Sequence, residues 1–332
     1  MTKTLNDLTM RDRKTTSVLA LMPTISVVIP TLNCEAELRN LLMSIGRQRY
    51  GGKIEIIVVD GNSTDGTIEV AESFGAIVIE APGSTINEAL LIGLKEASGQ
   101  FLWKLDSDNE ILEWDAAELL VAPFLVFENL DVTFPQLVVS KTAKSYERWL
   151  TNLEICNVEK LFKNGCENIN GFSYTNDLKF GISNASMIKV DSICKAGGIM
   201  SDFMLLFRMR QLGLAKAVFV ENVHFNHKQD VTPVTFVTKW SRRIRSDSHK
   251  DWIVPHKFSD SFTNTSLNTV SAPDRLDNLL DPMGTAFYSL RMFARTRDLI
   301  WCWGILNLVI VALIFITSPL SAIRLYKSTK GR

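Results

Sequence analysis

Two aspartates, Asp106 and Asp108, stand two positions apart directly after the apolar run 101–105. At this spacing on a turn, both carboxylates can reach one divalent cation together with a diphosphate group. Oxygen ligands of this kind favour Mg²⁺ or Mn²⁺, and the cation would neutralise negative charge that develops on a departing diphosphate. Polar surface turns also carry aspartates at this spacing, so a solvated turn is the alternative for the pair taken alone.

The elements before this turn alternate between strand and helix patterns, which predicts an α/β fold with a doubly wound, mainly parallel sheet. Ligands of such a sheet gather at the carboxyl ends of its strands, where Asp60 and Asp106 are expected to lie. Apolar runs predict strands at 25–29, 54–59, 76–79 and 101–105. Helical spacing of apolar residues predicts helices at 35–47, around 68–71 and at 86–97.

The pattern becomes less regular after Asp108. The same criteria predict further helices at 116–130, 145–162 and 204–212. They predict further strands at 132–139, 180–183 and 217–223.

Three segments, taken together in this order and spacing, resemble family 2 glycosyltransferases of the GT-A fold. They are SVVIPTLNCEAEL at 26–38, VVDGNSTDGT at 58–67 and FLWKLDSDNEI at 101–111. The resemblance runs from about residue 25 to 227, and it implies a metal-dependent enzyme that takes sugar from a nucleotide-sugar donor. It also implies that Asp106 and Asp108 are the metal ligands.

The resemblance further implies which residues hold the base and ribose of the donor. A carboxylate at the end of a buried strand, such as Asp60, can accept hydrogen bonds from a base N–H or a ribose hydroxyl. Asp65 is a further candidate, with helix capping as its alternative role. The donor-binding residues implied are Thr31, Asn33, Glu35, Asp60 and Asp106.

The segment GISNASMIKVDSICKAGGIMSDFMLLFRMRQLG, at 181–213, resembles the acceptor-side stretch of the same family. The resemblance implies that Asp202 is the catalytic base, which in an inverting transfer takes the proton from the incoming hydroxyl. Ser201 and Met204 depart from the acidic neighbours usual there. The alternative for Asp202 is an N-cap of the following helix, and one residue can do both.

The segment VFVENVHFNH, at 218–227, resembles the closing strand in which a histidine completes the metal site, which implies His227 as a third ligand. A structural role is the alternative for a single histidine. The family often has an Arg-Asn pair on the donor-side helix, where this chain has Leu90 and Leu91. Basic residues of 239–245 are the alternative source of phosphate contacts.

Composition excludes several classes of function. The 332 residues carry 36 Lys plus Arg and 36 Asp plus Glu, so no overall field favours nucleic acid as a partner. The five cysteines form no CxxC pair, and their odd number argues against a disulfide framework. Residues 30–35 contain no glycine, which argues against a nicotinamide-binding turn and against a nucleotidyltransferase phosphate loop.

Residues 299–316 contain no charged side chain and only one strongly polar one, Asn307. This run meets the minimum length for crossing a bilayer, with a buried core helix as the alternative. We therefore predict an N-terminal extension at 1–23, a catalytic domain at 24–253, a linker and juxtamembrane segment at 254–298, a transmembrane helix at 299–323 and a basic tail at 324–332. Without a secretory signal, the catalytic domain is expected on the cytoplasmic side of the membrane.

A transferase held at a membrane is well placed to act on a lipid-linked acceptor, such as a polyprenyl phosphate or its sugar-bearing form. The rival hypothesis is a degenerate relative that binds a nucleotide-sugar or scaffolds a membrane complex without turnover. Asp106, Asp108 and Asp202 argue against that rival, because a binding protein does not need them.

Overall fold

The computed structural model describes residues 22–176, 178, 185–198, 202–228, 230–238 and 282–317 of the chain. Within the helices, the side chains of 157–165, 202–204, 206–207, 282–284, 311 and 313–317 lie outside this description. The predicted strand at 180–183 and the predicted basic stretch from 239 onward also lie outside it.

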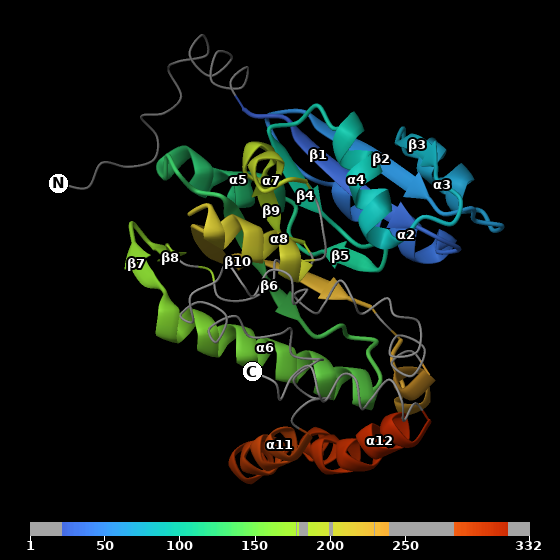
Figure 1. The fold of residues 1–332 in the computed structure, drawn as a ribbon, viewed down its shortest axis with the longest axis vertical. Helices are drawn as coiled ribbons and strands as arrows, with labels where there is room; N and C mark the ends of the chain where they lie inside the picture. Colours follow the sequence, from blue (N-terminus) through green and yellow to red (C-terminus); the bar gives the residue numbers. More distant parts are fainter. Residues whose placement is uncertain are drawn as a thin grey trace, which may run out of the picture.

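The first half of the chain is a parallel α/β unit, as the sequence predicts (Figure 1). Its sheet has the order β3-β2-β1-β4, and every pairing within it is parallel. Its elements are β1 (Ile25–Thr31), α2 (Glu35–Gly46), β2 (Ile54–Asp60), α3 (Thr67–Ser73), β3 (Ile77–Glu80), α4 (Ile86–Glu96) and β4 (Phe101–Lys104).

The second half extends the same sheet with mixed pairings, so the prediction of a mainly parallel sheet is wrong here. β9 (Met187–Lys189) lies antiparallel between β4 and β6 (Val132–Val138), whereas β6 and β10 (Ala217–His227) are parallel. β10 also pairs antiparallel with β5 (Asn109–Ile111) and with β8 (Phe172–Thr175). Most of these antiparallel pairs join segments that are far apart in the sequence, and among the described pairs only one hairpin is closed by a short turn.

The hairpin of β7 (Glu167–Ile169) and β8 contains this short turn. Its two connecting residues, Asn170 and Gly171, have φ angles of 54° and 84°. Asn-Gly is the preferred sequence for a two-residue hairpin with both residues in the left-handed region. The two strands therefore follow from a local signal that the strand prediction did not use.

Helices cover both faces of the sheet. One core cluster joins Ile25, Val27 and Ile29 of β1 to the buried side chains of α2, α3 and α5 (Ala116–Val126). The other joins Val28 of β1 to α4, α7 (Val190–Lys195) and α8 (Asp202–Gln211). Side chains of β1 alternate between the two clusters because successive residues of a strand point to opposite faces. The result is a three-layer arrangement with the strand ends open at its edge.

A third apolar cluster lies apart from the sheet. It joins α6 (Ser145–Gly165) to α11 (Pro282–Thr296), the short 3₁₀ helix at Leu299–Cys302 and α12 (Trp303–Thr317), which lie below α6 in Figure 1. The predicted transmembrane stretch 299–323 begins as this 3₁₀ helix and continues as α12. Its last residues, 318–323, lie outside the described part of the structure. Among the helices described, none combines the length and apolar character needed to cross a bilayer.

Glu55 connects β1, β2 and the turn before β4 at the edge of the sheet opposite the strand carboxyl ends. Its carboxylate accepts hydrogen bonds from Ser26 Oγ at 2.5 Å and from the backbone and hydroxyl of Ser98, each at 2.6 Å. Burial alone would raise the pKa of Glu55, but the hydrogen bonds from Ser26 and Ser98 outweigh burial and lower the pKa to about 2. The ionised carboxylate therefore stabilises the fold.

We expect Glu55→Gln to lower the free energy of unfolding by on the order of 2 kcal/mol at neutral pH. Because the folded pKa is depressed, the wild-type advantage is present above pH 4.5 and is lost as pH falls towards about 2. Urea unfolding at a series of pH values measures the difference. Glu72→Gln, an exposed change on α3, is the control. A pH-independent difference would contradict this assignment.

Candidate functional site

Asp60 and Thr31 lie opposite each other at the carboxyl ends of β2 and β1. Asp60 is fully buried and accepts hydrogen bonds from Thr31 Oγ1 at 2.8 Å, from Ser63 Oγ and N at 2.6 Å and from Asn62 N at 3.0 Å. Burial alone would raise the pKa of Asp60, but the bonds from Ser63, Thr31 and Asn62 outweigh it and hold the pKa below its ordinary value. Asp60 therefore stays ionised and holds the turn at 61–63 in place.

The loops that follow β1 and β2 are tied to each other by reciprocal hydrogen bonds. Asn33, with φ of 49°, donates from its backbone N–H to Ser63 Oγ at 2.8 Å, and its side-chain oxygen accepts from Thr64 N at 2.8 Å. Asn tolerates this left-handed conformation better than most residues. Asn33, Thr31 and Asp60 are thereby brought together, which is the arrangement predicted for a donor site.

Asp65 and Glu35 complete this junction. Asp65 accepts hydrogen bonds from the backbone of Thr67 at 3.1 Å and from the backbone of Glu35 at 3.2 Å. The N-cap of α3 is Gly66, without a side-chain cap bond, so Asp65 lies one residue before the position that the alternative prediction gives it. Its first bond holds the turn that leads into α3, and the second links this turn to α2. The Glu35 side chain is half-exposed and lies 3.1 Å from Arg39 Nη2. Its carboxylate remains accessible to a ligand.

The turn between β4 and β5 carries both predicted metal-ligand aspartates. Asn109, almost fully buried, closes this turn: its side-chain oxygen accepts from Asp106 N at 2.8 Å, and its backbone N–H donates to Asp106 O at 3.0 Å. Sequence reasoning missed this positioning residue. The sequence contains a signal for it, since an Asn that follows a polar turn commonly forms a hydrogen bond to the backbone two or three residues away.

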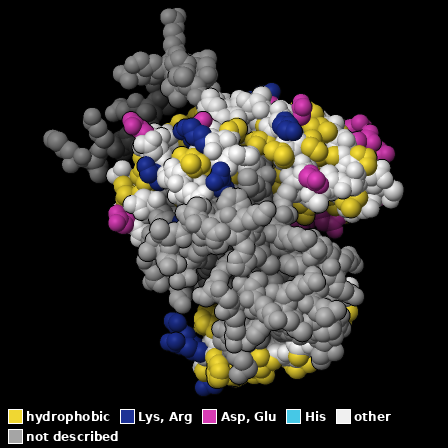
Figure 2. Space-filling model, in the orientation of Figure 1, with side chains coloured by type: hydrophobic (Ala, Val, Ile, Leu, Met, Phe, Trp, Pro, Cys, Tyr) yellow, Lys and Arg dark blue, Asp and Glu magenta, His cyan; other side chains and the backbone are white. Residues whose placement is uncertain are grey.

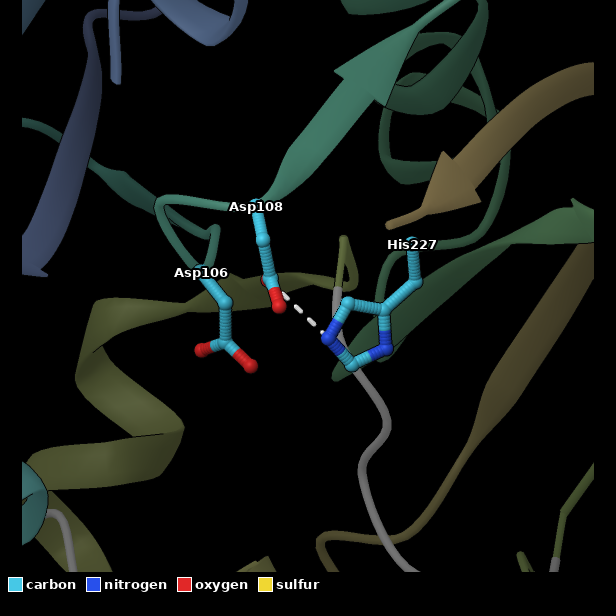
Figure 3. A group of neighbouring side chains, drawn as sticks. All are labelled: Asp106, Asp108 and His227. Carbon is cyan, nitrogen blue, oxygen red and sulfur yellow. Dashed lines mark ion pairs between the residues drawn. The ribbon is translucent and has the colours of Figure 1, made fainter. Parts of the chain in front are cut away.

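His227 reaches the same turn through strand pairing. It is the last residue of β10 and lies opposite Asn109 of β5, and the next residue, Lys228, donates its backbone N–H to Asp108 O at 2.9 Å. The side chains of Asp106, Asp108 and His227 converge, and one ligand atom from each lies within 4.8 Å of the others (Figure 3). The structure thus brings together the three predicted metal ligands.

The donor set fits a divalent cation. His227 Nε2 lies 2.9 Å from Asp108 Oδ1, yet that oxygen has no hydrogen-bond partner of acceptable geometry, although it is buried. A buried carboxylate oxygen in this state is costly, and a bound cation would satisfy it. Two carboxylates with one imidazole suit Mn²⁺, and carboxylates alone also suit Mg²⁺. Asp106, Asp108 and His227 would be the ligands.

A cavity of about 290 Å³ opens beside the metal ligands. Half of its ten lining residues are acidic, and its one cationic side chain, Lys228, lies 3.1 Å from Glu110. Carboxylates in such a wall can accept hydrogen bonds from the hydroxyl groups of a ligand. The lining residues that carry this argument are Glu37, Asn40, Asp108, Glu110, Glu147 and Lys228.

The remaining predictions concern α4 and α8. Leu90 is buried in the core, and a Cβ at Gly93 would lie 2.3 Å from Val28, so this part of α4 serves close helix–strand packing rather than phosphate binding. Asp202 is the first residue of α8. Its side chain lies outside the described part of the structure, so its predicted role as the catalytic base stays a prediction.

The fold is an α/β sheet with a group of candidate metal ligands beyond the carboxyl ends of its strands. Residues 26–193 match the sequence model of a protein family, glycosyl transferase family 2. The chain belongs to this family, and it is a glycosyltransferase.

Parts of the chain are similar in sequence to named glycosyltransferases. It is 29% identical over 155 residues to the PGL/p-HBAD biosynthesis glycosyltransferase of Mycobacterium bovis, covering 43% of this chain and 60% of the relative. It is 32% identical over 110 residues to the GalNAc(5)-diNAcBac-PP-undecaprenol beta-1,3-glucosyltransferase of Campylobacter jejuni, covering 30% of this chain and 34% of the relative. The match thus spans three fifths or less of the length of these relatives.

The fold is also shared with the mannosyltransferase PcManGT of Pyrobaculum calidifontis, whose structure contains GDP-Man and Mn²⁺. The two chains superpose with a TM-score of 0.52 at 16% identity, covering 93% of this chain and 86% of the other. At this identity the comparison shows the fold alone. It supports the GT-A arrangement of a mixed α/β sheet.

We expect the purified chain to bind Mn²⁺, and we expect Asp108→Asn and His227→Gln each to weaken this binding at least about ten-fold, because each removes a ligand. Titration calorimetry or the electron paramagnetic resonance signal of free Mn²⁺ measures the affinity. Asp115→Asn, outside the cluster, is the control and should leave it unchanged. Equal affinities for all four proteins would refute the metal site.

Proposed function

We propose that this glycosyltransferase moves a sugar from a nucleoside-diphosphate sugar to a hydroxyl acceptor with inversion of configuration. The observation that carries the proposal is the convergence of Asp106, Asp108 and His227 beside the tied loops of β1 and β2. A cation bound there would neutralise charge on the departing nucleoside diphosphate. The donor base and ribose would lie against the carboxyl ends of β1 and β2, at the switch point of the sheet.

Residues of this chain have separate tasks in the proposed transfer. Asn33, Glu35 and Thr31 bind the nucleoside, while Asp60 holds the turn that completes this binding surface. Asp202 accepts the proton of the attacking hydroxyl. An inverting transfer needs a single base on the face of the sugar opposite the leaving group, and the start of α8 offers a carboxylate for that role.

The lining of the cavity beside Asp108 suits an acceptor that carries several hydroxyl groups. Besides the proposed metal ligand Asp108, four of its lining side chains are carboxylates, and two of these, Glu110 and Asp230, are paired with lysines. Sugar hydroxyls would find hydrogen-bond acceptors there, in Glu37 and Glu147 above all. We therefore favour the sugar-bearing form of a lipid-linked acceptor over a bare polyprenyl phosphate. The Campylobacter relative carries an undecaprenol-linked glycan in its name, which supports this class of acceptor.

A lipid-linked acceptor would require the catalytic domain to work at a membrane. We propose that the C-terminal segment holds the chain there, with the catalytic domain on the cytoplasmic side where nucleotide-sugars are made. The apolar character of 299–316 supports this proposal.

The direct test of the function is product identification. Purified protein is incubated with membranes and with each member of a panel of nucleotide-sugars, and the products are identified by mass spectrometry. The proposal expects one donor to yield a glycosylated membrane lipid, with loss of product in excess chelator and recovery with Mn²⁺ or Mg²⁺. Donor binding without turnover across the panel would favour the degenerate binding protein instead.

We expect Asp202→Asn to lower kcat by about 100-fold or more with little change in donor affinity, because only the proton acceptor is lost. Steady-state kinetics and donor titration separate the two effects. Asp191→Asn, on the neighbouring helix α7, is the matched control. Near-normal turnover of the Asp202 variant would move the role of base to another residue.

We expect Glu37→Gln to raise the KM for the acceptor several-fold and to leave the KM for the donor unchanged, because Glu37 lines the cavity proposed for the acceptor. Initial rates at varied acceptor and donor concentrations give the two constants. Glu72→Gln is the control on the adjacent helix. A change confined to the donor constant would place the acceptor elsewhere.

A further inference from the structure

The hairpin of α11 and α12 buries two polar side chains among the apolar ones that face the rest of the protein. Ser289 of α11 and Asn307 of α12 are both fully buried. Trp149 Nε1 of α6 donates to Ser289 Oγ at 3.3 Å, and the Tyr146 hydroxyl donates to Asn307 Oδ1 at 3.4 Å. These contacts are directional, so they fix which faces of the two helices turn towards α6.

Close helix–helix contact fixes the geometry of the hairpin itself. A Cβ at Gly304 would lie 2.1 Å from Ser289 Oγ, so only glycine permits this approach of α12 to α11. Ile300, Trp301 and Ile310 are buried in the same cluster. The hairpin is therefore a packed part of the protein, with one face committed to α6 and the opposite face left outside.

The outer face is strongly apolar. Large side chains there are exposed by 43% to 73%, which is unusual for so many neighbours on a short segment. Figure 2 shows apolar side chains gathered at the lower end of the molecule, where Figure 1 places α11 and α12. The exposed residues are Phe287, Leu290, Leu299, Ile305, Leu306 and Val309.

Arginines border this apolar face. Arg291, Arg295 and Arg297 are all exposed, and Asp298 is the only acidic residue in 282–317. Asp298 accepts a hydrogen bond from Ile300 N at 3.0 Å and thereby caps the 3₁₀ helix. Figure 2 shows Lys and Arg side chains at the edge of the apolar region. An apolar surface with a basic border matches the acyl boundary and phosphate groups of an anionic membrane.

We propose that the outer face of the α11–α12 hairpin docks in the plane of an anionic lipid surface. Its apolar side chains would enter the acyl boundary, and Arg291, Arg295 and Arg297 would contact lipid phosphates. A second copy of the chain would bury the apolar face equally well, but it would bring two sets of these arginines together. Lipid is therefore the occupant that the charges favour.

This inference rests on the membrane attachment proposed above and assigns the surface responsible for it. It also links that surface to the site. Tyr146 and Trp149 of α6 contact the hairpin, and Glu147, between them in sequence, lines the cavity beside Asp108. Docking would hold the first turn of α6, and with it one wall of the cavity, near the headgroups of the bilayer.

The test is vesicle flotation of the purified full chain with phosphatidylcholine alone or mixed with phosphatidylglycerol. We expect binding to the mixed vesicles that weakens at high salt, and much weaker binding to phosphatidylcholine alone. Arg291→Gln with Arg295→Gln should lower the affinity by roughly 25-fold, since each surface arginine contributes roughly 5-fold. Leu306→Ser with Val309→Ser should abolish measurable flotation.

The matched control is Leu125→Ser with Val126→Ser, which alters two exposed apolar residues at the end of α5. It should float as the unaltered protein does, and circular dichroism melts should show that all variants are folded. Binding that is unchanged in the hairpin variants, or that is equal on both vesicle types, would overturn the proposal. A wild-type dimer that the hairpin substitutions convert to monomer without altering flotation would assign the face to a second copy instead.

Vesicle binding is measured without transfer, so its outcome is independent of the enzymatic proposal. If flotation follows the expected pattern and no donor yields a product, the docking surface stands and the function falls. If transfer to a lipid acceptor occurs but flotation does not depend on the hairpin, the function stands and this inference falls.

Discussion

The antiparallel pairing of β5 with β10 is the contact on which the metal site depends. β5 has only three residues, and Ile111 and Phe225, which lie opposite each other in the pair, are both buried in the first core cluster. Their burial fixes the register, because a slip by one residue would turn these side chains out of the core. In this register His227 lies opposite Asn109, and its ring reaches Asp108.

The two halves of the sheet have different tasks for a physical reason. The parallel half ends in loops whose backbone groups are hydrogen-bonded by Asp60, Asn33 and Asp65, so these loops would offer a rigid surface to the proposed nucleoside. The mixed half places the short strand β5 at the same edge of the sheet, and the turn before β5 directs the carboxylates of Asp106 and Asp108 towards one point. In the proposed function, donor recognition and cation binding would meet where β1 and β4 are neighbours.

Two buried carboxylates, Glu55 at one edge of the sheet and Asp60 at the other, accept several hydrogen bonds each, which offset the free-energy cost of burying their charge. Glu55 and Asp60 each receive several donors, and both pKa values lie below their ordinary range. Asp108 differs, because its buried Oδ1 has the contact of 2.9 Å with His227 Nε2 but no hydrogen bond of acceptable geometry. The contrast separates two carboxylates that stabilise the fold from one whose buried oxygen a cation would satisfy.

The sequence by itself determined the parallel α/β half, the positions of Asp60, Asp106 and Asp108 at strand ends, and the family, because these follow from local apolar runs and closely spaced motifs. It did not determine the mixed half of the sheet, the role of Asn109, or the partners of α11 and α12. These depend on pairings between distant segments: β5 with β10, and Trp149 with Ser289. Local periodicity carries no information about such pairings, since the packing of the whole chain selects them.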